Sequence, residues 1–124
     1  LERELTRSTA KWKIVYGHHP VYSYAGHGEN AVMERLLLPV LRGRADVYLA
    51  GRDRVFQHLK PVDGCHFLVG SAAGQSARNV ETGPNTLGAD SFYGFTMFEA
   101  DGEKLVITAV DTDQKTRYTT TLKR

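Results

Sequence analysis

The chain has few of the sequence features that mark disulfide-linked, membrane-spanning or nucleic-acid-binding proteins. Its single cysteine, Cys65, excludes an internal disulfide, and we expect it to be a small buried or half-buried residue. No apolar run approaches the length that crosses a bilayer, and the charged start at Leu1 to Glu4 is unlike a signal peptide. The formal net charge is only +2 and the basic residues are scattered, so we expect neither a nucleic-acid nor a membrane partner.

The chain also lacks an initiating methionine, internal repeats and low-complexity segments. A length of 124 residues, of which 41% are hydrophobic, suits one domain with a real core and is too short for two. We therefore expect a single domain over 1–124, and we expect it to be a piece of a longer protein.

The first part of the chain has the pattern of a strand-helix-strand unit. Apolar and polar residues alternate over 12–16, which predicts a strand. Apolar residues then recur at helical spacing over 32–41, with Asn30 as a candidate cap and Pro39 expected to kink or shorten the helix. The apolar run 47–50 predicts a short buried parallel strand.

The remainder of the chain has the pattern of antiparallel strands joined by turns. Turn signals lie at 61–64 and 101–102, and the polar, Gly/Pro/Asn-rich stretch 75–90 predicts a long surface loop. Strands are expected over 55–59, 66–69, 93–100, 105–110 and 118–122. The fold class predicted from these patterns is α/β, with one strand-helix-strand unit followed by antiparallel strands.

Two loops carry side chains of the kinds that bind ligands or take part in catalysis. Gly17 to Pro20, followed by His27, comes after the first strand, and Gly51 to Gln57 comes after the strand 47–50. A right-handed strand-helix-strand unit places the carboxyl ends of both strands at one edge of the sheet, where ligands collect in α/β proteins. We therefore interpret the two loops as parts of one site.

The first loop, Gly17-His18-His19-Pro20-Val21-Tyr22-Ser23 with His27-Gly28, resembles the histidine loop of the purple acid phosphatases, which belong to the calcineurin-like metallophosphoesterases. The second, Gly51-Arg52-Asp53-Arg54 followed by Gln57, is similar to their Gly-His-Asp-His loop with both histidines changed to arginine. The resemblance implies that the chain is the C-terminal half of such a catalytic domain, and so half of an α/β/β/α sandwich. It also implies an extracytoplasmic or secreted parent protein.

The resemblance assigns roles to four positions. In the family, His18 would ligate one metal of a dinuclear iron/zinc-type centre, and His27 would lie near the leaving group as a catalytic acid or phosphate contact. The positions of Arg52 and Arg54 would each supply an imidazole to a metal. The remaining ligands would come from the N-terminal half.

The two arginines change what this site can do. Two-metal phosphoester hydrolysis needs both ions, and a protonated guanidinium has no lone pair to donate to either. We therefore expect no bound dinuclear centre, with His18 as a vestigial ligand. Arginine suits phosphate, so Arg52, Arg54 and His27 become candidate phosphate-binding residues.

Two functions remain open at this point. One is a phosphoester hydrolase fragment of the acid phosphatase type, inactive alone because ligands are missing or replaced, with a phosphate ester or phosphate ion as its ligand. The alternative is a non-catalytic half-domain or scaffold that self-associates and binds phosphate weakly. The expected protein partner is an N-terminal half or a second copy of the chain, since half a sheet exposes an edge.

Other polar residues have simpler interpretations. We expect His19 to be structural and Asp53 to be a loop carboxylate that pairs with its arginines or with the backbone. His58 and His66 are expected to be strand-face residues with no convergent group nearby. The stretch 70–74 lacks the Lys and Ser/Thr of a P-loop and predicts a close-packed turn.

Overall fold

The structure is a computed structural model that describes residues 1–25 and 30–124. Its elements are α1 (Glu2–Arg7), β1 (Ile14–Gly17), α2 (Ala31–Leu41), β2 (Val47–Ala50), β3 (Phe56–Val62), β4 (Cys65–Val69), β5 (Thr86–Asp90), β6 (Gly94–Ala100), β7 (Lys104–Asp111) and β8 (Thr116–Lys123). The predicted fold class is confirmed: a mixed sheet with its helix is followed by an antiparallel sheet. No helix of the described residues is long and apolar enough to span a membrane.

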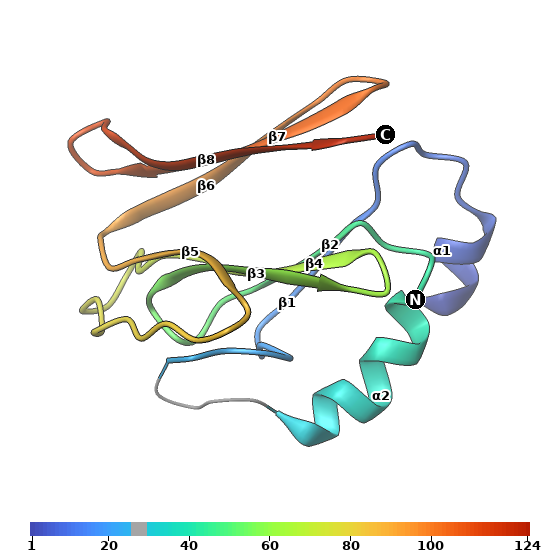
Figure 1. Cartoon of the computed structure of the whole chain (residues 1–124), viewed down its shortest axis with the longest axis horizontal. Coiled ribbons are helices and arrows are strands. Elements are labelled where there is room, and N and C mark those ends of the chain that lie inside the picture. Colours follow the sequence, from blue (N-terminus) through green and yellow to red (C-terminus); the bar gives the residue numbers. More distant parts are fainter. Residues whose placement is uncertain (26–29) are drawn as a thin grey trace.

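The strands form two sheets that lie in separate layers. The first has five strands in the order β1-β2-β4-β3-β5, and the second has three in the order β6-β7-β8. Figure 1 shows the three-stranded sheet over one face of the larger sheet and α2 below the opposite face. The described chain is thus a helix layer, a mixed sheet and an antiparallel sheet.

The strand-helix-strand unit forms as predicted. β1 and β2 are parallel, with Gly17 opposite Ala50 at their carboxyl ends. Asn30 caps α2, because its side-chain oxygen accepts a hydrogen bond from Met33 N at 3.1 Å. Pro39 does not shorten the helix, which continues to Leu41.

Replacing the capping residue Asn30 by alanine is expected to lower the free energy of unfolding by about 1 kcal/mol, because one orphan N–H of the first turn loses its acceptor. Urea denaturation measures the change. The control is Asn79→Ala, at an exposed position of the loop before β5 that should change stability by less than about 0.5 kcal/mol. Equal losses in the two variants would contradict the capping role.

The pairing of β4 corrects the expectation that every strand after 47–50 pairs antiparallel. β4 lies between β2 and β3 and is parallel to β2, with Ala50 opposite Val69. Asp63 and Gly64 join β3 to β4 with φ of 49° and 82°, the left-handed conformation of a tight two-residue hairpin turn. This turn reverses the chain, so β4 ends at the same edge of the sheet as β1 and β2.

A second correction concerns the stretch 75–90, which was expected to be a loop throughout. Its last five residues, Thr86–Asp90, form β5, which pairs antiparallel with β3 at the edge of the large sheet. The segment has the polar and glycine content of a loop, and pairing with β3 decides its conformation. Gly88 is required there, because a Cβ would lie 2.2 Å from the Tyr118 ring.

Two apolar cores follow from the alternation of side chains along the strands. One core packs Leu38 and Leu41 of α2 against the face of the large sheet that carries Tyr48 and Phe67. The other fills the space between the sheets with Val47, Phe56, Leu68, Phe92, Leu105, Ile107 and Ala109. Neighbouring residues such as Phe67 and Leu68 therefore belong to different cores.

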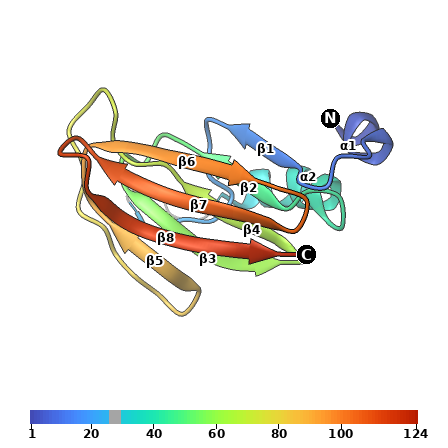
Figure 2. The same ribbon diagram turned by 90° about the horizontal axis from the view of Figure 1, so that it is seen from above.

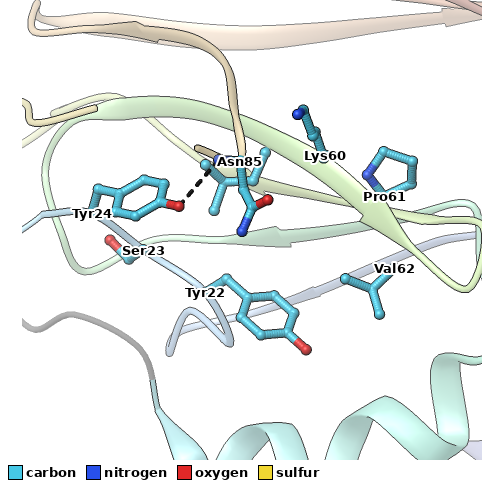
Figure 3. Close-up of a pocket in the computed structure, with 8 residues that line it drawn as sticks. Tyr22, Ser23, Tyr24, Lys60, Pro61, Val62 and Asn85 are labelled. Atoms are coloured by element: carbon cyan, nitrogen blue, oxygen red, sulfur yellow. Dashed lines mark hydrogen bonds between the residues drawn. The ribbon is translucent and has the colours of Figure 1, made fainter. Parts of the chain in front are cut away.

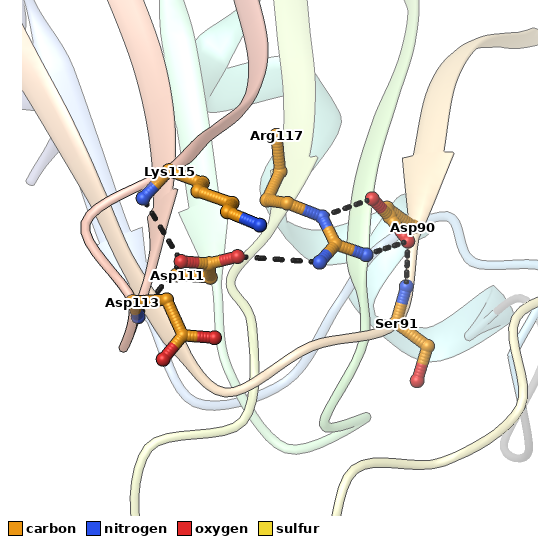
Figure 4. A network of polar contacts seen from close by, with 6 residues as sticks. All are labelled: Asp90, Ser91, Asp111, Asp113, Lys115 and Arg117. Atoms are coloured by element: carbon orange, nitrogen blue, oxygen red, sulfur yellow. Dashed lines mark hydrogen bonds and ion pairs between the residues drawn. The ribbon is translucent and has the colours of Figure 1, made fainter.

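A polar network joins the ends of the two sheets. The Arg117 guanidinium donates to both oxygens of Asp90 at 2.9 and 3.1 Å and to Asp111 at 3.2 Å, and it lies between the two carboxylates (Figure 4). The hydrogen bond from Arg117 lowers the pKa of Asp90, and backbone donation from Lys115 is the main cause of the lowered pKa of Asp111. The network ties β8 to the end of β5.

Candidate functional site

Three loops meet at the carboxyl edge of the parallel strands. The backbone N–H of Gly51 donates to the carbonyl of Gly17 at 3.3 Å, so the loops after β1 and β2 lie together as predicted. The N–H of Gly70 donates to the carbonyl of Ala50 at 2.8 Å, which places the loop after β4 beside them. The prediction from sequence contained two of these three loops.

A cleft of about 490 Å³ opens where the three loops meet. It is lined by His18, Arg52, Arg54, Gly70, Ser71, Ala72, Ala73, Gly74, Gln75 and Arg78. The set contains three guanidinium groups and one imidazole, and no carboxylate is among its described members. The cleft is therefore cationic, and its small residues leave room for a ligand.

The two arginines after β2 adopt unusual backbone conformations. Arg52 has φ of 68° and Arg54 has φ of 58°, both in the left-handed region that non-glycine residues seldom occupy. Each such residue costs on the order of 1 kcal/mol and persists only when its surroundings hold it. The strained turn places both side chains in the lining of the cleft.

Neutral side chains orient both guanidinium groups. Arg52 donates to Nδ1 of His19 at 2.8 Å, and Arg54 donates to Oε1 of Gln75 at 3.1 Å. His19 must therefore carry its proton on Nε2, and its own carbonyl accepts from the Tyr48 hydroxyl at 2.9 Å. His19 thus orients Arg52. Because both acceptors are neutral groups, these two hydrogen bonds do not neutralise the positive charge of either arginine.

A buried polar cluster behind the cleft links the first two loops. The Ser23 hydroxyl donates to Asp53 Oδ2 at 2.5 Å and accepts from Gln57 Nε2 at 2.9 Å, and Gln57 Oε1 accepts from the N–H of Tyr24 at 2.9 Å. Asp53 and Gln57 are fully buried and Ser23 is nearly so. Ser23 of the other loop is thus a direct partner of Asp53 that was not predicted from sequence, and the expected pairing of Asp53 with its arginines or the backbone stays a prediction.

The structure places the remaining predicted residues as follows. His18 is exposed and lines the cleft with Arg52 and Arg54, while His27 lies outside the described residues. Arg78 and Ser71 also line the cleft and were not predicted from sequence. Arg78 is anchored by its N–H to the Arg54 carbonyl at 3.1 Å, a contact between distant segments that sequence spacing does not reveal.

The stretch 70–74, predicted as a close-packed turn, is part of the lining of this cleft and of a neighbouring one. The second cleft has a volume of about 320 Å³ and includes Leu49, Ala50, Tyr16 and Phe95 among its lining residues.

A smaller pocket of about 130 Å³ lies elsewhere, where Tyr24 accepts from the N–H of Asn85 (Figure 3). Lys60 is the charged residue in the lining of that pocket, and the arginines of the cationic cleft do not line it.

The histidines in β3 and β4 do have convergent partners, which corrects the expectation for them. His58 Nε2 lies 2.8 Å from His66 Nδ1, and His58 Nδ1 lies 2.8 Å from the Tyr118 hydroxyl in the other sheet. Burial, and then the neighbouring His66, lower the pKa of His58 to about 4. The chain of three side chains connects the two sheets and lies apart from the cationic cleft.

The donor set of the cleft does not fit a dinuclear metal centre. His18 is the one imidazole among the described lining residues, and the guanidiniums of Arg52 and Arg54 cannot coordinate a cation. Among residues 1–25 and 30–124, no group of three or more His, Cys, Asp or Glu side chains is arranged to hold a metal ion. The positive charge of the described lining residues is suited to an anion.

Comparison with known proteins relates the chain to phosphatases over part of their length, although no family model matches it. Purple acid phosphatase 4 of Arabidopsis thaliana is 47% identical over 60 residues, which cover 48% of this chain and 18% of that protein. Tartrate-resistant acid phosphatase type 5 of Rattus norvegicus is 28% identical over an alignment that covers 100% of this chain and 41% of that protein.

A solved structure described as GAP50, the anchor in the inner membrane complex of Plasmodium, has the same fold over part of its length. The structural match covers 97% of this chain and 39% of the GAP50 chain, with a TM-score of 0.86 and 22% sequence identity. The curated relatives above are also matched over only part of their length, since the alignments cover 18% and 41% of those two proteins. The chain is therefore homologous to part of the purple acid phosphatases and shares its fold with part of GAP50.

Proposed function

We propose that the chain is a phosphatase-derived domain that binds phosphate or a phosphate monoester and does not hydrolyse it. The observation that carries the proposal is the cleft in which Arg52, Arg54, Arg78 and His18 converge without a described carboxylate. Guanidinium groups bind phosphate oxygens through paired, charge-assisted hydrogen bonds. Partial homology to acid phosphatases supports phosphate as the anion.

The arginines place positive charge where the resemblance assigns metal ligands. A phosphate dianion can then be held by fixed cations, while the activated water that a metal pair would supply is missing. The correspondence to the C-terminal half of a catalytic domain, and the role of His27 beside the phosphate, remain parts of this proposal. His27 lies outside the described residues.

Titration with inorganic phosphate at pH 7, followed by NMR of the whole chain, tests binding. We expect saturable shifts of the Arg52, Arg54 and His18 signals at millimolar phosphate or below. The double variant Arg52→Gln with Arg54→Gln should weaken binding at least tenfold, because two charge-assisted contacts are lost. Arg35→Gln, at an exposed position of α2, is the matched control and should bind like the parent. Absence of shifts at millimolar phosphate would overturn the proposal.

Hydrolysis is tested separately with p-nitrophenyl phosphate in the presence of added iron or zinc. We expect no turnover above the uncatalysed rate for this chain. Turnover that a chelator abolishes would contradict the non-hydrolytic assignment and favour an active phosphoesterase.

A second candidate function, self-association, is favoured by the open edges of both sheets. Ile14 and Tyr16 of β1 and Phe95 and Met97 of β6 are exposed apolar residues on edge strands, and Figure 2 shows β1 and β6 along the same side of the molecule. Unpaired strands with apolar side chains favour pairing with another chain. A dimer by light scattering, combined with no response to phosphate, would favour this alternative.

A further inference from the structure

We infer that two copies of this chain form a two-fold dimer through the side of the molecule that carries β1 and β6, with β6 of one copy paired to β6 of the other. The inference rests on the self-association named above as the second candidate function. It adds the surface that is used and the occupant of that surface, and it does not depend on phosphate binding.

Two of the four edge strands in the described sheets are protected by charge. β5 and β8 lie on the side of the molecule away from β1 (Figure 2), and the Arg117 guanidinium of β8 donates to both oxygens of Asp90 at the end of β5. β8 also carries Lys123 at an exposed position. Charged side chains on an edge strand oppose pairing with another chain. This side of the molecule is therefore unsuited to strand addition.

The edge strand β6 lacks such protection. It is seven residues long, and the stretch 94–98 contains neither a charged residue nor a proline. In the described part of the chain β6 pairs with β7 on one side and has no strand on the other. A long, uncharged edge strand with exposed apolar side chains such as Phe95 and Met97 is a template for a further strand.

The surface around β6 has both projecting rings and hollows. Tyr16 of β1 and Phe95 of β6 are exposed, and both line the cleft of about 320 Å³ between these strands. A second cleft, of about 440 Å³, continues from Tyr16 along β1 past Ile14 and Trp12 to α1. A two-fold interface uses the same patch on both copies, so the patch must complement itself. Rings beside apolar clefts meet this requirement, because a ring of one copy fills a cleft of the other.

Pairing of β6 with its own copy also avoids a clash of charge. With the two-fold axis at Met97, antiparallel pairing sets Met97 opposite its counterpart and Glu99 of each copy opposite Phe95 of the other. The two negative charges therefore do not face each other, and like charges directly opposite would be unfavourable. The two three-stranded sheets then form one antiparallel sheet of six strands.

The exposed apolar area on this side suits a stable dimer. Four large apolar residues of β1 and β6 are 36%, 82%, 57% and 39% exposed, in the order Ile14, Tyr16, Phe95 and Met97. At roughly 200 Å² for a fully exposed large side chain, they present about 400 Å² per copy and about 800 Å² in a dimer. Since a little over half of a typical interface is apolar, the whole interface would bury about 1,400 Å², which is the size of stable complexes.

Sedimentation velocity and light scattering of the whole chain, from low micromolar to submillimolar concentration, test the dimer. We expect a reversible monomer–dimer equilibrium with a micromolar or lower dissociation constant. The double variant Phe95→Lys with Met97→Lys should raise that constant at least 100-fold, because like charges then meet at the two-fold axis. Thr119→Lys with Thr121→Lys adds the same charge at exposed positions of β8 and is the matched control, which should dimerise like the parent.

Two further measurements keep the test informative. Hydrogen exchange should show backbone amides of β6 gaining protection as concentration rises, while those of β5 and β8 stay unchanged. If circular dichroism shows that the β6 variant has lost its native structure, Tyr16→Lys replaces it. Because Tyr16 is the most exposed of the four apolar residues, we expect this variant to fold and to weaken the dimer at least tenfold.

The outcomes separate the interface from self-association itself. A chain that remains monomeric at every concentration overturns both. A dimer that survives in the folded β6 variant, or one that the β8 control weakens equally, overturns this interface while self-association stands. A series of ever larger species would contradict the closed two-fold dimer. None of these results decides whether the cationic cleft binds phosphate, which is measured independently.

Discussion

Replacing Asp53 by alanine is expected to lower the free energy of unfolding by about 3–4 kcal/mol. The fully buried carboxylate accepts a 2.5 Å hydrogen bond from Ser23, which also holds Gln57. Its removal eliminates a charge-assisted hydrogen bond, leaves a small cavity and frees a buried hydroxyl from its acceptor. Chemical denaturation followed by circular dichroism measures the loss.

The same substitution should also weaken phosphate binding. Asp53 lies between Arg52 and Arg54, whose left-handed conformations persist only while the surrounding contacts hold the turn. Without the bond to Ser23, the loops after β1 and β2 lose a direct link, and the two guanidinium groups lose their fixed placement. Phosphate affinity, measured at a temperature where the variant remains folded, is therefore expected to fall at least tenfold.

Two controls distinguish the buried contact from a general effect of charge. Asp53→Asn keeps an oxygen that accepts from the Ser23 hydroxyl, so we expect a smaller loss of about 1–2 kcal/mol. Asp113→Ala removes a carboxylate at an exposed position of the turn between β7 and β8 and should cost less than about 0.5 kcal/mol. If Asp53→Ala were as mild as Asp113→Ala, the cluster would not determine the geometry of the site.

Acidification from pH 7.5 to pH 4 is expected to lower the free energy of unfolding by roughly 3 kcal/mol through the pair His58 and His66. Burial lowers the pKa of His58 from 6.5 to about 4, and burial also lowers that of His66, which the Asp46 carboxylate opposes. Between these pH values the unfolded chain binds more protons than the folded chain, so stability falls as pH falls. The full contribution is present above the unfolded pKa of 6.5.

The geometry explains why protonation is unfavourable here. His58 bonds to His66 through one ring nitrogen and to Tyr118 through the other, and its side chain is only 1% exposed. A second proton on the pair would place two cations within hydrogen-bond distance at the junction of the two sheets. Loss of the Tyr118 contact would then loosen β8 against the large sheet.

Urea denaturation at a series of pH values measures this dependence. His58→Gln cannot titrate and keeps polar atoms in the cluster, so most of the slope between pH 4 and 6.5 should disappear in that variant. The lowered pKa values of Asp90 and Asp111 act in a separate window, because their contribution to stability is lost only as pH falls below about 4. An unchanged slope in His58→Gln would show that the histidine pair is not the cause.

The strand-helix-strand unit was predictable because local patterns determine it. Alternation before Gly17, helical spacing from Ala31 and the buried run 47–50 each indicate one element, and a right-handed connection fixes how they assemble. β5 was missed because Thr86–Asp90 has the composition of a loop and becomes a strand only through its pairing with β3. Local composition carries no information on that partner.

By itself, the sequence determined that the loops carrying His18 and Arg52 share one edge of a sheet, and that the second loop brings guanidinium groups there. Both conclusions follow from short-range patterns and from the right-handed connection of the strand-helix-strand unit. Only the tertiary structure brought Arg78 and Ser71 into the cleft and joined His58 to Tyr118, which is 60 residues away. The physical reason is that the parallel insertion of β4 beside β2 and the stacking of the second sheet are decided by the packing of two cores, which the pattern of any single segment does not encode.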